Sequence, residues 1–249
     1  MQTKIQKASA IGRCFFRARR FSNSGAPIYN GCMNQAPTLE AEQALWAKGY
    51  RLVAGLDEAG RGALAGPVVA AAVVIDPGTA SHPLWSHVRD SKLLTPAQRR
   101  ALAPQIEAVA LAWGIGCVPA HAIDQFGIAA ATRQAMCEAV GGLNVRPAYL
   151  LIDWVKLPAL NIPQQSSAKA DQRIACVAAA SILAKVYRDG CMVALDGHYP
   201  AYGFAAHKGY GAAAHLAAIR QCGPCPEHRH SFAPLAQKPA LFAAQPATG

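Results

Sequence analysis

Two adjacent carboxylates, Asp57 and Glu58, lie between two apolar runs that have the length of buried strands. The segment between the runs also carries Gly60-Arg61-Gly62, so a flexible loop joins the two predicted strands at a charged tip. Carboxylates at a strand end are costly to desolvate unless a cation neutralises them, and oxygen-bound divalent metal ions commonly do so. The pattern predicts a metal-binding carboxylate pair. A polar turn with solvated charges is the alternative.

Two further carboxylates lie at the ends of predicted elements. Asp153 ends an apolar run, and because sites in open α/β sheets lie beyond the carboxyl ends of strands, Asp57 and Asp153 would meet if their strands are parallel neighbours. Asp171 lies at the start of a long alanine-rich segment, where a capping aspartate keeps one oxygen free to face a metal. Asp153 could instead bond only its own loop, and Asp171 could be only a helix cap.

Cationic and aromatic side chains form a second group of candidates. Ser91 and Lys92 precede a predicted helix and could contact phosphate or lie in a solvated loop. Residues 202–210 interleave aromatics with His207 and Lys208, which suits a surface that lays a ring on a sugar or base and a cation on phosphate. A glycine-rich loop without function is the alternative for this block.

The elements that must position these residues follow from apolar periodicity and from capping residues. The predicted strands are nearly all apolar, so we expect helices on both faces of their sheet. The expected strands cover residues 51–56, 68–75, 111–118 and 148–153. The expected helices cover residues 37–46 with Thr38 as cap, 97–110 with Thr95 as cap, 119–141 with a break near Gly127, 169–192, and 212–220.

Five separated motifs resemble, in order, those of the ribonuclease HII family. They are GLDEAGRG with AGPVVA from residue 55, DSK at 90–92, LID at 151–153, AAASILAK at 178–185, and the block from Tyr202-Gly203-Phe204 to His207-Lys208-Gly209-Tyr210. The resemblance runs from about Arg51 to Phe232. It implies a ribonuclease H-like α/β fold: a mixed sheet that begins as a meander, flanking helices, and a helical C-terminal part.

The resemblance also implies an activity: an endoribonuclease that cleaves the RNA strand of RNA–DNA hybrids and incises 5′ of ribonucleotides embedded in duplex DNA. Hydrolysis would use two Mg²⁺ or Mn²⁺ ions and leave a 3′-hydroxyl and a 5′-phosphate. The implied catalytic metal ligands are Asp57, Glu58, Asp153 and Asp171. The implied substrate-binding residues are Gly60, Arg61, Gly62, Ser91, Lys92, Lys185, His207, Lys208 and Tyr210. A nucleic-acid-binding protein that keeps the fold without catalysis is the competing hypothesis.

Three positions depart from the family pattern. Trp154 follows Asp153 where glycine is usual, Ala170 replaces a glycine before Asp171, and Gly211 stands where a threonine often follows. None of these departures removes an implied metal ligand.

The net charge of +10 favours a polyanionic partner, although six cations lie in the first twenty residues. No acid precedes Glu40, so the N-terminal segment resembles a transit peptide, or upstream sequence before a true start at Met33. We expect residues 1–38 to be disordered, 39–235 to form the catalytic domain, and 236–249 to be a flexible tail. We also expect a monomeric cytoplasmic protein without membrane contact.

The pair Cys222 and Cys225 has the spacing of a redox motif. A redox motif begins a helix, whereas this pair follows a predicted helix end at Gly-Pro, which disfavours a redox role. Zinc binding by this pair with His228 and His230 is a further alternative, although the spacing fits common structural zinc sites poorly.

Overall fold

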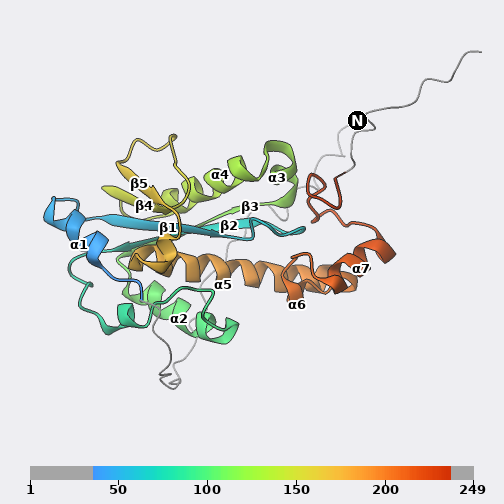
Figure 1. The fold of residues 1–249 in the computed structure, drawn as a ribbon, viewed down its shortest axis with the longest axis horizontal. Helices are drawn as coiled ribbons and strands as arrows, with labels where there is room; N and C mark the ends of the chain where they lie inside the picture. The colour runs from blue at the N-terminus through green and yellow to red at the C-terminus, as the bar shows by residue number, and fades with distance from the viewer. Residues whose placement is uncertain (1–35, 237–249) are drawn as a thin grey trace, which may run out of the picture. The chain divides into compact units, whose positions relative to one another are not determined.

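The computed structural model describes residues 36–236. The predictions for residues 1–35 and 237–249, including the basic extension and the tail, lie outside the described residues and stay predictions. Thr38 already lies in the folded unit, because it forms an isolated parallel bridge with Ile174. The sheet and its flanking helices are labelled in Figure 1.

A five-stranded mixed sheet has the order β3-β2-β1-β4-β5. Its strands are β1 (Val53–Ala59), β2 (Val68–Ile75), β3 (Ala112–Val118), β4 (Tyr149–Asp153) and β5 (Gln164–Ser167). The first three strands form the expected antiparallel meander, and β4 lies parallel to β1 on the other side. The predicted ribonuclease H-like mixed sheet is confirmed.

Helices cover both faces of the sheet, as the apolar strands predict (Figure 1). The face with Val53, Val73 and Ile75 packs on one cluster, and the face with Ala54, Ala72 and Val74 packs on another. Helices α5 (Ala175–His198) and α2 (Pro96–Val109) cover the first face, and α3 (Ala120–Phe126) and α4 (Ile128–Gly141) cover the second. Apolar burial on both faces makes β1 and β2 the centre of the core.

Glycine allows two of these helices to approach the sheet closely. A Cβ at Gly55 in β1 would lie 2.3 Å from the backbone of Cys176, and one at Gly116 in β3 would lie 1.9 Å from the carbonyl oxygen of Ala135. The chain needs glycine at both positions because a side chain there would collide with helix backbone.

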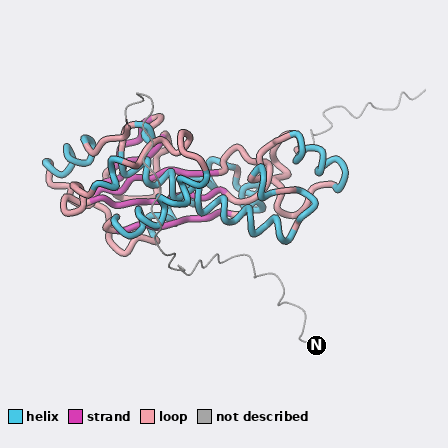
Figure 2. The backbone as a smooth tube through the Cα atoms, turned by 90° about the horizontal axis from the view of Figure 1, so that it is seen from below, coloured by secondary structure: helices cyan, strands magenta, loops and turns pink. Residues whose placement is uncertain are grey.

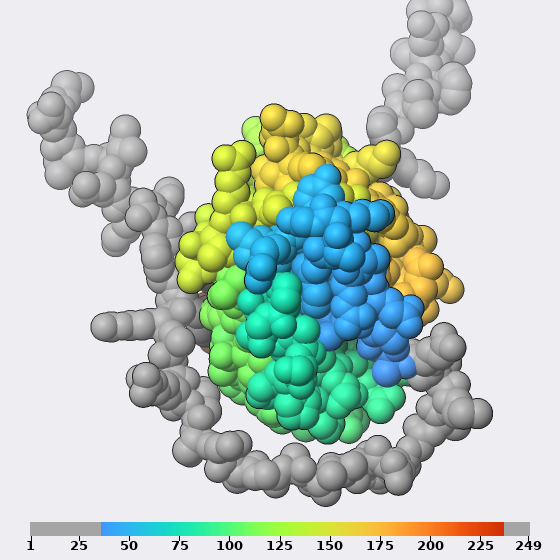
Figure 3. Space-filling model, turned by 90° about the vertical axis from the view of Figure 1, so that its left-hand side faces the viewer, coloured from blue at the N-terminus to red at the C-terminus, as the bar shows by residue number. Residues whose placement is uncertain are grey.

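The C-terminal part is built from helices and loops around its own small core, beyond the region where the strands gather (Figure 2). Its helices are η3 (Pro200–Tyr202), α6 (Phe204–His207) and α7 (Ala213–Cys222). At the opposite end of the sheet lies α1 (Glu40–Ala47), whose blue surface faces the viewer in Figure 3 beside the teal residues near η1 (Pro83–Ser86). The Tyr210 block therefore belongs to a helical C-terminal part, as expected.

The local predictions are confirmed in some places and wrong in others. Thr95 caps α2 through a capping box with Gln98, and Gly127 separates α3 from α4. Thr38 does not cap α1, because Leu39 holds the N-cap position without a side-chain bond. No helix among residues 36–236 has both the length and the apolar character needed to cross a membrane.

The predicted helix over residues 169–192 begins later than expected. A separate turn, η2 (Ala170–Gln172), precedes α5, which begins at Ala175 with Ile174 at its N-cap. Asp171 is therefore not the cap of the long helix. The edge strand β5 has the sequence QQSS, and so it lacks the apolar pattern by which strands are predicted.

Candidate active site

Strands β1 and β4 bring Asp57 and Asp153 to one place. The two strands are parallel and hydrogen-bonded neighbours, and Leu56 pairs with Ile152. Asp57 and Asp153 are each the next residue of their strand, although β1 continues to Ala59, so the predicted loop carboxylates Asp57 and Glu58 lie within β1. The prediction that the strands of Asp57 and Asp153 are parallel neighbours is confirmed. Parallel strands present their carboxyl ends at one edge of the sheet.

The turn η2 carries Asp171 to the same site. Lys169 has φ +58, a left-handed conformation that reverses the chain after β5, and Asp171 in the turn is 1% exposed. The Ala170 N–H donates to Asp153 Oδ1 at 2.8 Å. This bond ties Asp153 to the turn that holds Asp171.

Burial controls the charge of these carboxyl groups. Desolvation raises the pKa of Asp57 to about 6, although the nearby Lys185 ammonium and a hydrogen bond from Ser181 act in the opposite direction. Desolvation and the neighbouring Asp57 charge raise the pKa of Glu58 to about 7. Burial also raises the pKa of Asp153. A bound cation would favour the charged forms of these acids and so would lower their pKa values.

Two lysines supply positive charge beside the carboxylates. Lys92 Nζ donates to Asp171 Oδ2 at 2.8 Å, while 61% of the Lys92 side chain stays exposed. Burial opposes the charge of Lys92, but Asp171 more than offsets it and holds the pKa of the ammonium above its ordinary value. Lys185 Nζ donates to Ser181 Oγ at 2.7 Å, and Ser181 in turn bonds Ser91 Oγ at 2.8 Å.

The donor atoms suit a hard cation in kind, although their positions do not form a closed cage. Buried Glu58 Oε2 and Asp171 Oδ1 have no hydrogen-bond partner among residues 36–236, and unpartnered carboxylate oxygens are costly without a cation. As these side chains stand, no three His, Cys, Asp or Glu residues of the described part converge on one metal position. Metal binding would therefore have to draw the carboxylates together, with Lys92 released from Asp171.

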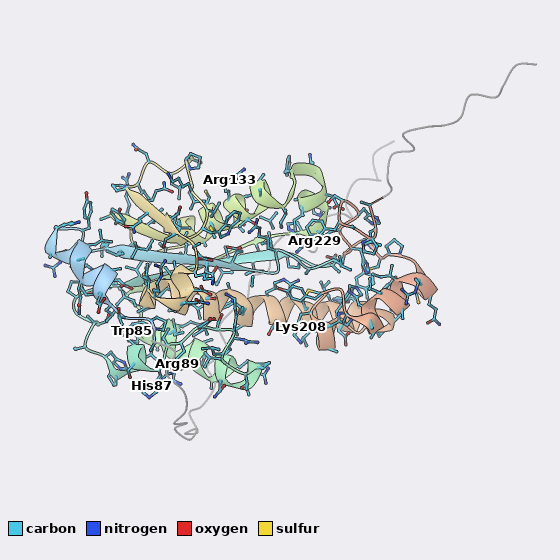
Figure 4. The ribbon with its side chains drawn as sticks, viewed as in Figure 1. Trp85, His87, Arg89, Arg133, Lys208 and Arg229 are labelled. Atoms are coloured by element: carbon cyan, nitrogen blue, oxygen red, sulfur yellow. The ribbon has the colours of Figure 1, made fainter. Side chains whose placement is uncertain are left out.

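Two buried arginines, Arg188 and Arg229, contact the glycine loop between β1 and β2 from the protein interior. Gly60 has φ +89, and a Cβ there would lie 1.7 Å from Arg188 Nε. A Cβ at Gly62, in contrast, would meet nothing within 4 Å. Arg229 donates to the carbonyl oxygens of Arg61 at 2.9 Å and of Gly66 at 2.9 and 3.0 Å. Figure 4 shows Arg229 near the adjoining ends of β1 and β2. The loop is thus fixed with the Gly62 position open.

The predicted sugar- and phosphate-binding block lies beside that loop. The Tyr210 side chain is 45% exposed, and the guanidinium carbon of Arg188 lies 5.3 Å from its ring centre. Lys208, labelled in Figure 4 beside α6, donates to the Ala205 carbonyl oxygen. The Leu64 N–H donates to the Gly209 carbonyl at 2.8 Å, so the block and the glycine loop are joined directly.

Comparison with known proteins agrees with this geometry. A family model described as Ribonuclease HII matches residues 54–235. The chain belongs to the ribonuclease HII family. It is 54% identical over 200 residues to a ribonuclease HII from Roseiflexus castenholzii, which covers 80% of this chain and 89% of that protein. Ribonucleases HII are metal-dependent nuclease hydrolases, so the chain belongs to an enzyme family.

Solved structures of archaeal proteins share the fold. The ribonuclease H2 of Pyrococcus horikoshii OT3 matches with a TM-score of 0.64 and 28% identity, covering 74% of this chain and 95% of that one. The RNase HII of Archaeoglobus fulgidus, solved in complex with PCNA, matches with a TM-score of 0.62 and 25% identity over 75% of this chain and 97% of that one. The family match over residues 54–235 includes both the sheet and the C-terminal part.

Three residues of this ribonuclease HII site were missed by sequence reasoning. Ser181 links Lys185 to Ser91, and its spacing of four from Lys185 on one helix was a usable signal. Arg188 donates to the carbonyl oxygens of Pro67, Ala65 and Lys208. Arg188 and Arg229 carried no signal, because an isolated arginine in a sequence is usually a surface residue.

The structure supports neither the redox nor the zinc alternative for Cys222 and Cys225. Cys222 is exposed, whereas Cys225 is buried with its Sγ 3.1 Å from His228 Nδ1, and burial raises the pKa of the Cys225 thiol. A raised pKa disfavours the thiolate that redox chemistry needs. The zinc alternative has no group of three converging ligands among the described residues.

Proposed function

We propose that the chain is an endoribonuclease that cleaves the RNA strand of RNA–DNA hybrids and incises 5′ of single ribonucleotides embedded in duplex DNA. The observation that carries the proposal is that β1, β4 and η2 bring carboxylates to one end of the sheet, beside the open glycine loop. Membership of the ribonuclease HII family supports the same reaction class.

The four acids Asp57, Glu58, Asp153 and Asp171 would hold two Mg²⁺ or Mn²⁺ ions. When bound, these ions supply positive charge that activates a water and stabilises the leaving oxygen of the phosphodiester. The chain contributes the oxygens and their positions: the Ala170 N–H orients Asp153, and the Glu58 N–H donates to Asp57 Oδ1 at 2.7 Å. Each bond leaves other carboxylate oxygens available to the ions.

The cations around the acids suit the phosphates of a nucleic acid. Lys92 is largely exposed and its ammonium bonds one carboxylate oxygen of Asp171, so it can turn to a phosphate once that oxygen is engaged. Ser91 and Ser181 are fully buried, so their hydrogen-bonded chain can position the Lys185 ammonium, whereas the Ser91 hydroxyl itself is not exposed to a phosphate.

Selection of RNA over DNA requires contact with the 2′-hydroxyl. The Gly60-Arg61-Gly62 loop can bring main-chain groups close to a sugar, since Gly62 has no neighbour over its Cβ position. Tyr210, exposed beside that loop, would stack on the adjoining deoxyribose. His207 and Lys208 are assigned to the substrate surface too, although His207 uses both ring nitrogens inside the protein.

The test is cleavage of a labelled duplex that carries one ribonucleotide, with Mg²⁺, with Mn²⁺ and with chelator. We expect metal-dependent incision at the 5′ side of the ribonucleotide, with 3′-hydroxyl and 5′-phosphate ends, and no cut in a matched all-DNA duplex. A second labelled substrate, a long RNA–DNA hybrid, should be cut in its RNA strand. Binding of both duplexes without cleavage under any metal would instead identify the non-catalytic alternative.

A further inference from the structure

Trp154 has a backbone conformation that suits glycine. It follows Asp153 at the end of β4 with φ +52, and its side chain is 40% exposed. A bulky side chain at positive φ is strained by roughly 1 kcal/mol or more and persists where the surroundings over-determine it. Because the ring is not buried in the core, core packing does not explain the conformation.

The indole instead contacts two parts of the site. The guanidinium carbon of Arg61 lies 3.7 Å from the centre of the Trp154 ring, a close cation–π stack. On the same side chain, Nε1–H donates to Glu58 Oε1 at 3.4 Å. The backbone of Trp154 is anchored as well, since its N–H donates to the Ser167 carbonyl oxygen at 3.1 Å.

These contacts complete the support of the glycine loop. Arg229 holds the carbonyl oxygen of Arg61 from the buried side, and Trp154 holds the guanidinium of the same residue. Arg61 is therefore fixed at both its main chain and its side-chain tip. A free arginine side chain on a loop loses much rotational freedom on binding, and a stack formed beforehand removes part of that cost.

We propose that Trp154 is a positioning residue that sets ribonucleotide selection by holding Arg61, and through it the Gly60-Arg61-Gly62 loop, in the sugar-reading arrangement. The inference rests on the proposed function, because it concerns selection by the same site. The hydrogen bond to Glu58 gives Trp154 a second, separable effect on the orientation of that carboxylate.

Two substitutions separate the two contacts. Trp154→Gly removes both the stack and the hydrogen bond while relieving the positive φ, and so it should fold with an unchanged or higher Tm. Trp154→Phe keeps an aromatic face for Arg61 but has no N–H for Glu58. Selection is measured as the gap between two constants: the KM for a duplex with one ribonucleotide, and the Ki of the matched all-DNA duplex as an inhibitor. The Ki reports phosphate contacts alone.

We expect Trp154→Gly to narrow the gap between these two constants by about three- to tenfold, the size of one cation–π contact. Trp154→Phe should keep most of the gap, whereas its kcat should fall because the hydrogen bond to Glu58 is absent. The double variant Arg61→Ala with Trp154→Gly should select no worse than Arg61→Ala alone, because the tryptophan acts through the arginine.

The outcomes that overturn the inference are distinct from failure of the proposed function. Additive losses in the double variant would mean that Trp154 contacts substrate directly. An unchanged gap in Trp154→Gly, or a gap that shrinks only together with a large fall in Tm, would mean that the residue has no positioning role. If the wild-type protein itself does not cut the ribonucleotide duplex, the proposed function fails before the variants are compared.

Discussion

Two groups of buried and half-buried ionisable side chains differ in how their polar atoms are satisfied. The carboxylates beside β1 and β4 include two oxygens, Glu58 Oε2 and Asp171 Oδ1, without a hydrogen-bond partner among residues 36–236. The histidines of the C-terminal part, His207, His215 and His228, use all six ring nitrogens. The two unpartnered carboxylate oxygens are free to bind a ligand, whereas the histidine nitrogens are already engaged in the structure.

The histidine hydrogen bonds form one consistent chain. The Cys225 N–H donates to His228 Nδ1 at 2.9 Å, so His228 donates from Nε2 to His215 Nε2 at 3.1 Å, and His215 donates from Nδ1 to the Tyr210 carbonyl oxygen at 2.9 Å. This pattern assigns one neutral tautomer to each ring. If either His215 or His228 gained a second proton, one of these hydrogen bonds would be replaced by two N–H donors that face each other.

Burial of ionisable groups has two different consequences in this protein. At the acids, burial raises the pKa of Asp57 and Glu58 and prepares a cation site. At the histidines, burial lowers the pKa of His228 to about 4, and the neutral rings support the backbone that presents Tyr210. The following experiments test that division.

Asp57→Asn should have the largest effect on activity, a loss of more than about a thousandfold in kcat, because a metal ligand is removed. Its Tm without metal should not fall, since an amide is cheaper to bury than a carboxylate. Duplex binding should change only a few-fold. Circular dichroism melting and a cleavage assay on the same sample check this, and full activity would contradict the metal assignment.

Gly62→Val should suppress cleavage of both the single-ribonucleotide duplex and the long hybrid by about a hundredfold, since the new side chain enters the open space over the loop. Its Tm should stay near the wild-type value. Gly60→Ala is the matched control, because its Cβ would collide with Arg188 and its φ is +89, so it should lose stability as well as activity. Equal Tm losses in both variants would remove the distinction between the two glycines.

Tyr210→Ala should cost about 1–3 kcal/mol in kcat/KM, by analogy with other stacking contacts on nucleotides. The loss should fall mainly on the duplex with a deoxyribose beside the ribonucleotide. The measurement is the ratio of kcat/KM on that duplex to kcat/KM on the long hybrid. Equal losses on both substrates would mean that Tyr210 is a packing residue with a structural role, like the histidines beside it.

His228→Gln should have the smallest effect on activity and a clear effect on the pH dependence of stability. Because the folded pKa of about 4 lies below the ordinary value of 6.5, the unfolded state takes up the proton first as the pH falls. The histidine's contribution to the free energy of unfolding is therefore present near pH 7 and is lost between pH 6.5 and 4. The Tm difference between wild type and His228→Gln should shrink over that range, and a constant difference would show that folding leaves the pKa of His228 unchanged.

The predictions succeeded where the local sequence pattern carries the physics. The apolar runs of β1 and β2 identify strands buried on both faces, and Thr95 identifies a helix start. They failed at β5, which is polar, and at the start of α5, because a single 3₁₀ turn has the same composition as a helix start. Short elements of this kind are fixed by their neighbours rather than by propensity.

The amino-acid sequence alone identifies the candidate functional residues: the adjacent acids, the glycine loop and the motifs of the ribonuclease HII family. Tertiary structure alone decided their relations, since the parallel pairing of β1 with β4 joins Asp57 to Asp153 across almost a hundred residues. It also decided the roles of Arg188, Arg229 and Trp154, because a side chain's role depends on what it touches. Hydrogen bonds to loop carbonyls and a ring under a guanidinium arise from long-range packing, for which no local pattern of residues is a signal.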